Sequence, residues 1–240
     1  MARAGQTERD IYNGEDPREI PAYSIPEAAH YLLIPPATLR SWVMGRNYPV
    51  KTGQKFFKPV ILIPNPSKPQ LSFINLVEAH VLDAIRRQHE IPLEKVRQGV
   101  AYLRKNLGSL HPLADQRMET DGRDLFVQIF GRLVNISQEG QFAMRELLSA
   151  HLERVERDVS GAARRLYPFT RKREGPEPRY VVMDPHISFG RPVLAGTGIP
   201  TSVIADRYKA GESVDQLAKD YDRERPEIEE AIRCELAEAA

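Results

Sequence analysis

The stretch Ser188-Phe-Gly-Arg-Pro-Val-Leu-Ala-Gly-Thr-Gly-Ile-Pro-Thr201 is the most informative part of this chain for the fold. Glycine permits positive φ or a close approach of the backbone, and proline fixes φ. Their dense spacing therefore predicts a tight segment of strand and turn. Together with the glycine that ends the next predicted helix, the residues expected to shape this structural motif are Gly190, Pro192, Gly196, Thr197, Pro200 and Gly211.

Three short helices are predicted after this segment. The first is expected over 201–210, with Gly211 at its end. The second, 213–221, begins with a capping box that Gln216 completes. The third, 225–238, opens on Arg-Pro, which suits a first helical turn. Three short helices joined by tight turns are typical of a homeodomain-like bundle.

This C-terminal segment resembles the domain of unknown function 433. The matching residues are Asp184-Pro185, Gly190-Arg191-Pro192-Val193, Gly196-Thr197, Ile199-Pro200, Ala210-Gly211-Glu212-Ser213 and Asp220-Tyr221. The resemblance implies a bacterial antitoxin of VapB type, paired with a PIN-like ribonuclease toxin. The family usually has an arginine where this chain has Gly198, so no role of that arginine carries over. The alternative reading is a small, stable helical tail.

The stretch from Tyr23 to Gly45 is the second informative one. Ser24 and Glu27 form a capping box for a short helix, and Ile34-Pro35-Pro36 forces a turn before a second helix. This helix-turn-helix resembles the opening of MerR-like DNA-binding domains, in which a tyrosine, a short helix, a turn and a Thr-Leu-Arg-x-Trp helix follow in this order. The residues expected to meet between the two helices are Ala28, Leu32, Leu39, Trp42 and Val43.

A β-hairpin is predicted directly after the helix-turn-helix. We expect a strand over 56–63, a turn over 64–69 and a return strand over 71–73. A hairpin at this place indicates a wing, so the sequence predicts a winged helix-turn-helix.

DNA contacts are expected from the exposed residues of the second helix and from the basic residues that follow it. Arginine can read guanine or bind phosphate, and lysine suits the phosphate backbone. The span 40–68 contains no Asp or Glu. The alternative is a solvated basic face on a structural domain. The candidate DNA-binding residues are Thr38, Arg40, Ser41, Arg46, Lys51, Lys55, Lys58 and Lys68.

Two helices and a mixed region are predicted in the middle of the chain. Asn75 is expected to cap one helix, and Pro92 to begin another that Gly108 ends.

Beyond them, Thr120-Asp-Gly-Arg123 suggests a hairpin turn between short strands, the later one over 124–129, with a further strand over 133–136. A long helix over 140–158 and a strand over 164–169 should follow.

The expected fold class is α+β, mainly α: a winged helix-turn-helix, a mixed middle region and a three-helix homeodomain-like bundle. The best linker candidate is the charged, proline-containing segment 170–179. The predicted divisions are a flexible tail (1–20), the DNA-binding domain (21–90), the middle region (91–178) and the antitoxin-associated domain (179–240).

Bulk properties limit the class of protein. The net charge is only +1, so any nucleic-acid contact must come from a local patch. The single cysteine, Cys234, permits no intramolecular disulfide and is expected as a small apolar residue inside the last helix. No apolar run approaches the ~18 residues of a membrane helix, and no signal peptide is recognised. We therefore expect a cytoplasmic bacterial protein without a membrane partner.

The sequence shows no constellation for catalysis. None of its six histidines has metal-ligand spacing to another histidine or to the cysteine, and no phosphate-binding loop or nucleophile motif is present. We expect no catalytic residue, no metal and no cofactor. The carboxylates of the last helix predict a solvated face, or a surface for a basic toxin: Glu224, Glu227, Glu229, Glu230, Glu235 and Glu238.

The sequence thus predicts an antitoxin of a type II toxin-antitoxin pair. It would neutralise a PIN-like ribonuclease toxin by direct binding and repress its own operon as a homodimer on operator DNA. A stand-alone MerR-like transcription regulator with a ligand-sensing middle region is the alternative, and a nuclease is disfavoured. Association is expected at apolar positions that so small a C-terminal bundle cannot all enclose: Val193, Leu194, Ile199, Val203, Ile204, Val214, Leu217, Ile228, Ile232 and Leu236.

Overall fold

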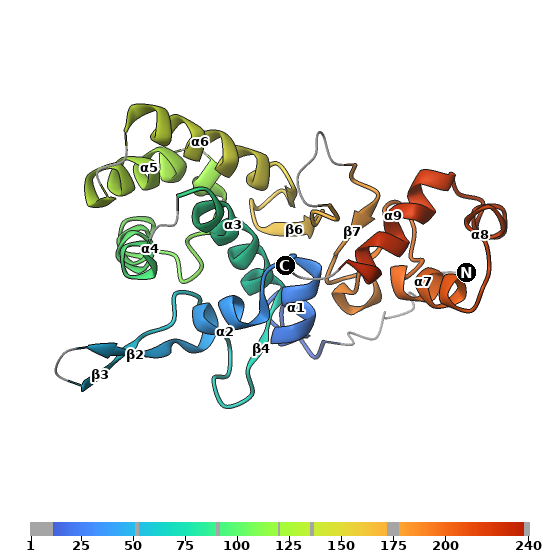
Figure 1. Cartoon of the computed structure of the whole chain (residues 1–240), viewed down its shortest axis with the longest axis horizontal. Coiled ribbons are helices and arrows are strands. Elements are labelled where there is room, and N and C mark those ends of the chain that lie inside the picture. Colours follow the sequence, from blue (N-terminus) through green and yellow to red (C-terminus); the bar gives the residue numbers. More distant parts are fainter. Residues whose placement is uncertain are drawn as a thin grey trace, which may run out of the picture.

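Helices joined by small two-stranded sheets make up most of the structure, which confirms the predicted α+β, mainly α, class. The computed structural model describes residues 12–50, 53–89, 92–119, 121–134, 137–171 and 178–237. In Figure 1 the blue N-terminal helices lie near the centre, between the green helices on the left and the orange and red helices on the right. No helix in the described residues is long and apolar enough to cross a membrane.

The first two helices form the predicted helix-turn-helix. Strand β1 (Tyr23–Ser24) leads into α1 (Ile25–Tyr31), and α2 (Pro36–Met44) follows. The capping box is present: the Glu27 amide donates to Ser24 Oγ at 3.3 Å, and the Ser24 amide donates to Glu27 Oε2 at 2.9 Å. All five residues predicted for this core are buried, namely Ala28, Leu32, Leu39, Trp42 and Val43.

The hairpin after this motif lies earlier in the chain than predicted. Strand β2 (Arg46–Val50) pairs antiparallel with β3 (Gly53–Phe57), so the wing begins immediately after α2. The prediction of a wing over 56–73 was wrong. Its expected return strand is instead β4 (Gln70–Leu71), which pairs with β1.

Packing explains the error. The apolar run after β3 is not a strand, because its amides bond to the end of α2. The amides of Val60 and Ile61 donate to the Trp42 carbonyl at 2.8 and 3.1 Å, and both side chains are buried. The true strands lack an alternation of apolar and polar residues, since β3 is largely exposed on both faces.

Helix α3 (Phe73–His89) begins with a capping pair that the sequence suggested only in part. The Asn75 amide donates to Ser72 Oγ at 3.3 Å, and the Ser72 amide donates to Asn75 Oδ1 at 3.2 Å. Ser72 is therefore the cap, and Asn75 is its partner three residues later. Helix α4 (Leu93–Leu107) starts after Pro92 and ends at Gly108, as predicted.

The middle region is helical where strands were expected. Helix α5 (Asp121–Val134) and helix α6 (Gln138–Leu152) form an antiparallel pair (Figure 1). The predicted hairpin turn at 120–123 and the predicted strand over 124–129 were wrong, because these residues belong to α5 from Asp121 onward. The predicted strand over 133–136 was also wrong for residues 133–134, which end the same helix. Residues 120, 135 and 136 lie outside the described ones.

Tertiary packing overrides the local Asp-Gly turn signal here. Phe126 and Val127 are fully buried on the inner side of α5. Gly122 lies over the 3₁₀ helix η1 (Gln116–Glu119), where an added Cβ would stand 2.8 Å from the Arg117 carbonyl oxygen. The glycine allows this close approach rather than marking a hairpin.

Helix α6 ends earlier than the predicted residue 158. Its last turn is followed by strand β5 (Val155–Arg157), which pairs antiparallel with β6 (Ala163–Leu166). The strand expected over 164–169 is therefore present but displaced toward its N-terminal end. The Leu166 and Met183 backbones also exchange hydrogen bonds, which ties β6 to the C-terminal segment.

The C-terminal segment has the predicted order of strand, turn and three helices. Strand β7 (Val181–Val182) pairs with β8 (Val193–Leu194). Helices α7 (Thr201–Lys209), α8 (Val214–Tyr221) and α9 (Arg225–Leu236) then form the bundle on the right of Figure 1. The predicted capping box at the start of α8 is present.

In the residues that the structure describes, the core consists of one large apolar cluster and two small ones. The C-terminal bundle has a small cluster of its own, made of Leu194, Ile204, Leu217, Ile228, Ala231 and Ile232. Cys234, buried as expected, belongs instead to the large cluster around α1–α3. The end of α9 therefore joins the bundle to the N-terminal part of the same chain.

Candidate nucleic-acid interface

Helix α2 separates an apolar face from a polar one. Leu39 and Trp42 face the core and are at most 1% exposed. On the other side Arg40 is exposed, while Thr38 and Ser41 are half-buried. The helix can therefore present polar side chains to a partner without disturbing its core.

A cavity of about 360 Å³ lies at this polar face. It brings together three of the predicted residues, Thr38, Ser41 and Arg46, with Phe57 of the hairpin and the start of α4 at Leu93. Within it, Ser41 Oγ donates to the Thr38 carbonyl at 2.7 Å. Helix α2, the hairpin and α4 thus share one concave surface.

The other predicted contacts do not line this cavity. The side chains of Arg40, Lys55, Lys58 and Lys68 are exposed, and among the described residues no carboxylate pairs with them. Lys51 lies outside the described residues. The local excess of positive charge is thus available to an anionic partner.

The base of the wing is held by residues that the sequence did not single out. The Tyr48 and Phe57 rings stack with centroids 3.8 Å apart and planes 12° apart. The Arg97 guanidinium of α4 lies 4.6 Å from the Phe57 ring centre, and its Nε donates to the Lys58 carbonyl at 2.9 Å. The sequence signal that could have revealed this arrangement is the presence of aromatic residues in an otherwise polar, exposed segment. Phe56, beside them, is 56% exposed.

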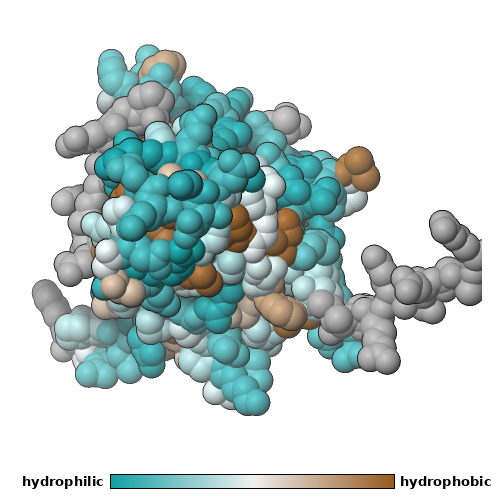
Figure 2. Space-filling view, turned by 90° about the vertical axis from the view of Figure 1, so that its right-hand side faces the viewer, coloured by the Kyte–Doolittle hydropathy of each residue, from teal (hydrophilic) through white to brown (hydrophobic). Residues whose placement is uncertain are grey.

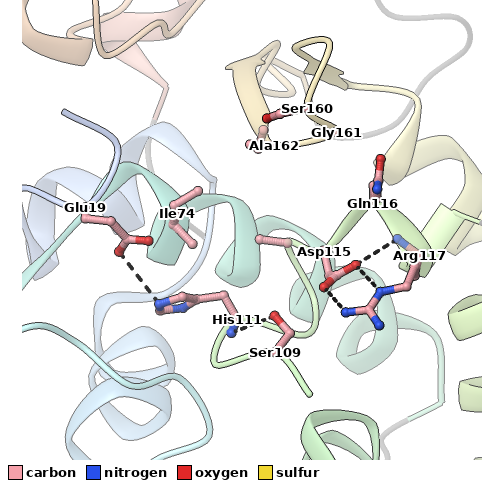
Figure 3. A pocket seen from close by; sticks show the side chains of 12 residues that line it. Glu19, Ile74, Ser109, His111, Asp115, Gln116, Arg117, Ser160, Gly161 and Ala162 are labelled. Carbon is pink, nitrogen blue, oxygen red and sulfur yellow. Dashed lines mark hydrogen bonds and ion pairs between the residues drawn. The ribbon is translucent and has the colours of Figure 1, made fainter. Parts of the chain in front are cut away.

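A second cavity, of about 430 Å³, lies in the middle region (Figure 3). In that view Ser160 and Gly161 lie across it from His111 and Asp115. Charged groups of its lining are paired: His111 contacts the buried Glu78 at 2.9 Å through Nδ1, and Asp115 pairs with Arg117 at 2.7 Å. In the described part of the chain, no group of three or more potential ligands could hold a metal ion.

The pKa values of the pair beside this cavity, Glu78 and His111, both differ from their ordinary values. Burial raises the pKa of Glu78, and the hydrogen bond from His111 offsets this only in part. Burial lowers the pKa of His111, but the hydrogen bond and the charge of Glu78 outweigh it, so this pKa lies above its usual value.

The C-terminal bundle presents a different surface. Figure 2 shows this end of the molecule as mainly hydrophilic, with separate apolar patches. Of the apolar positions expected to remain unenclosed, Val203 and Leu236 are more than 40% exposed, whereas Leu217 and Ile228 are fully buried.

The expected acidic face of α9 is only partly present. Glu230 is buried and binds Thr170, Arg171 and Arg233, so its assignment to a solvated face was wrong. Glu238 lies outside the described residues. The motif residues Gly190, Gly196 and Gly211 all adopt positive φ, the conformation for which glycine was predicted.

Both ends of the chain match protein families. Residues 21–100 match the family described as "Putative DNA-binding HTH domain", and residues 181–233 match "Protein of unknown function (DUF433)". The chain is 31% identical over 227 residues to the "Putative antitoxin VapB45" of Mycobacterium tuberculosis, covering 85% of this chain and 89% of that protein.

Two further similarities involve the same organism. The "Uncharacterized protein Rv2308" is 24% identical over 224 residues, covering 90% of this chain and 89% of that protein. The crystal structure of Rv2018 has a TM-score of 0.63 and 24% identity, covering 89% of this chain and 98% of that one, and it supports the fold alone.

These similarities define a class of helix-turn-helix protein with a C-terminal domain of unknown function 433, as the residue pattern predicted. The chain belongs to the family of VapB-type antitoxins.

Proposed function

We propose that this protein is an antitoxin that binds operator DNA and neutralises a PIN-like ribonuclease toxin by direct contact. The observation that carries the DNA-binding half is the cavity that joins Thr38, Ser41 and Arg46 to the base of the wing. An α-helix fits the major groove, and a neighbouring hairpin can follow the phosphate backbone. The exposed Arg40 is suited to reading guanine.

Electrostatics supports the same role. The whole chain carries almost no net charge, so attraction to DNA has to come from one surface. The exposed Lys55, Lys58 and Lys68, which follow α2 in the sequence, are suited to provide it. We assign the DNA-binding domain to residues 21–90 and the contact itself to the eight predicted residues, with Lys51 included on sequence alone.

The protein has no catalytic activity of its own in this proposal. Its effect on the toxin is stoichiometric, and its effect on transcription follows from occupying the operator as a homodimer. Two helix-turn-helix units would read inverted half-sites about 34–36 Å apart or at multiples of this spacing. The exposed apolar Val203 and Leu236 support association through the domain at 179–240, whether with a second copy or with the toxin. Light scattering of the full-length protein tests whether it associates with a second copy of itself.

A regulator with a ligand-sensing middle region is the second candidate. The cavity beside His111 favours it, because most of the residues that line it belong to the region 91–178. The ion pairs of His111 with Glu78 and of Arg117 with Asp115 already engage these charged groups, which counts against a ligand-binding role for the cavity. Co-purification with the PIN-like product of an adjacent reading frame, and inhibition of that product's ribonuclease activity, would decide for the antitoxin.

Replacing Arg40 and Arg46 with alanine tests the DNA interface. Each base-reading arginine contributes on the order of 1–3 kcal/mol to specific binding, so the double variant should bind operator DNA at least tenfold more weakly. Fluorescence anisotropy with DNA from upstream of the gene measures this. Arg225→Ala is the matched control, because this exposed arginine lies on α9, far from the interface in sequence and fold. Unchanged binding by a folded double variant would refute the assignment.

A further inference from the structure

We propose that the turn Ser188–Arg191 of the C-terminal domain positions the helix-turn-helix, so that the C-terminal domain sets the DNA affinity of the N-terminal one. This inference rests on the proposed DNA-binding function. It assigns a role to Gly190 and Arg191, which lie in the most informative stretch of the sequence but do not belong to the DNA interface.

The first contact is a buried hydrogen bond. The hydroxyl of Tyr23, at the entry to α1, donates to the Gly190 carbonyl at 2.8 Å. Tyr23 is 1% exposed, so this bond is shielded from water. Gly190 has φ +79°, and a Cβ added to it would stand 2.2 Å from the Tyr23 hydroxyl oxygen. The fit thus requires glycine both for its conformation and for the space it leaves to the tyrosine.

The second contact is made by Arg191 along one side of α1. Its guanidinium pairs with Glu27, the residue that completes the capping box with Ser24. The side chain of Tyr31, one helical turn further on, also acts on the guanidinium and helps to raise the pKa of Arg191. Arg191 is therefore tied to the first turn of this helix and interacts with its last residue.

Helix α1 in turn fixes α2, the helix that carries the proposed DNA contacts. The Ile34 amide between the two helices donates to the Ala29 carbonyl at 2.9 Å, which closes the turn. Leu39 and Trp42 of α2 pack in the same apolar cluster as α1. Cys234 of α9 also belongs to that cluster. A shift of α1 against the C-terminal domain therefore moves Thr38, Arg40 and Ser41 with it.

The backbone of the turn itself is strained. Ser188 and Phe189 adopt φ of +49° and +54°, a region that side chains other than glycine rarely enter. The Phe189 ring is 68% exposed, so burial of this ring does not hold it there. Such strain persists where surrounding contacts impose it. Around this turn they include the contacts of Gly190 and Arg191 with α1 and the ring of Tyr12, whose centroid lies 6.4 Å from that of Phe189.

A double-mutant cycle in the full-length chain tests the inference. Arg191→Ala removes the guanidinium, and Glu27→Gln removes the charge while leaving a side chain that can still complete the capping box. We expect each change to weaken operator binding by about 5- to 20-fold, with the double variant no weaker than Arg191→Ala alone. Arg191→Lys should recover part of the loss. Arg225→Ala, an exposed arginine of α9, is the control and should bind as the wild type does.

The only tryptophan of the chain separates positioning from unfolding. Trp42 lies buried in α2, so its emission reports whether the helix-turn-helix remains packed. We expect an unchanged emission maximum in Arg191→Ala. If that variant fails to fold, Tyr23→Phe replaces it, because this change removes only the hydroxyl bound to Gly190 and should also weaken DNA binding.

The outcomes distinguish the two proposals. Wild-type binding by folded Arg191→Ala, or losses that simply add in the double variant, would overturn the inference and leave the DNA-binding function intact. A wild-type chain that does not bind its upstream DNA would overturn both.

Discussion

Asp222 ends helix α8 in the left-handed region, with φ +51°. The Arg223 amide that follows donates to the Ala218 carbonyl at 2.9 Å, which closes the end of the helix. Glycine is the preferred residue in this conformation, because a Cβ crowds the backbone there.

Asp222→Gly should therefore stabilise the protein. We expect the free energy of unfolding to rise by about 0.5–1 kcal/mol, since the relief of strain is partly offset by the greater freedom of glycine in the unfolded chain. Chemical denaturation measures it. Gly211→Ala is the opposite control, because φ there is +104° and the change should destabilise. A neutral or destabilising Asp222→Gly would contradict this account.

Single residues were predictable where their partners are close in sequence. The pairs Ser24–Glu27 and Ser213–Gln216, and the helix end at Gly108, follow from spacing alone and are all present. The burial of Glu230 was not predictable, because Thr170 and Arg171 approach it from about 60 residues away. Partners at that distance leave no local mark in the sequence.

At the scale of elements, the wing depends on the glycine that precedes it. Gly45 has φ +73°, and an added Cβ would stand 2.2 Å from the Phe57 carbonyl oxygen and 2.6 Å from the Phe56 ring. A ring can move aside, but a backbone oxygen can move only if β3 shifts.

Gly45→Ala should displace the wing while leaving α1 and α2 folded. We expect a loss of about 1–3 kcal/mol in the free energy of unfolding and weaker operator binding. Thermal unfolding and anisotropy report the two effects. Gly53→Ala, at the start of β3, is the control for conformation alone, because nothing lies within 4 Å of its added Cβ. Equal behaviour of the two variants would show that the contact with Phe57 is unimportant.

Elements were predictable where their apolar pattern is strong. The helix-turn-helix and the three C-terminal helices follow from periodicity and caps. The hairpin at 46–57 and helix α5 did not, because the former has two exposed faces and the latter begins with an Asp-Gly turn signal. Of the candidate site, the polar residues of α2 could be named, whereas Arg97 contributes only through a fold that the sequence does not show.

At the scale of the whole molecule, acidity should favour the folded state through His111 and Glu78. Both groups bind a proton more tightly when folded, because the pKa of each lies above its ordinary value. The stabilisation from His111 is complete below its unfolded pKa of about 6.5 and is lost as pH rises through its folded pKa. Glu78 adds a loss in the same direction, beginning above its ordinary pKa.

We therefore expect the free energy of unfolding to fall as the pH rises from about 6 to 9, and to fall less in His111→Asn. Urea denaturation across this range provides the measurement. His186→Asn is the control, since this histidine is half-exposed and contacts Asp184 instead. A wild-type slope equal to that of His111→Asn would exclude this pair as the cause.

The contact between Arg191 and Glu27 also has a consequence for synthesis, since 164 residues separate its two partners. The helix-turn-helix is among the first elements to leave the ribosome. At about 5–20 residues per second, Arg191 follows Glu27 by roughly 8–33 s. During that interval the nascent α2 has no support from the C-terminal domain. If the C-terminal domain sets the DNA affinity as proposed, full affinity is reserved for chains translated nearly to completion, and prematurely terminated fragments should be poor competitors for the operator.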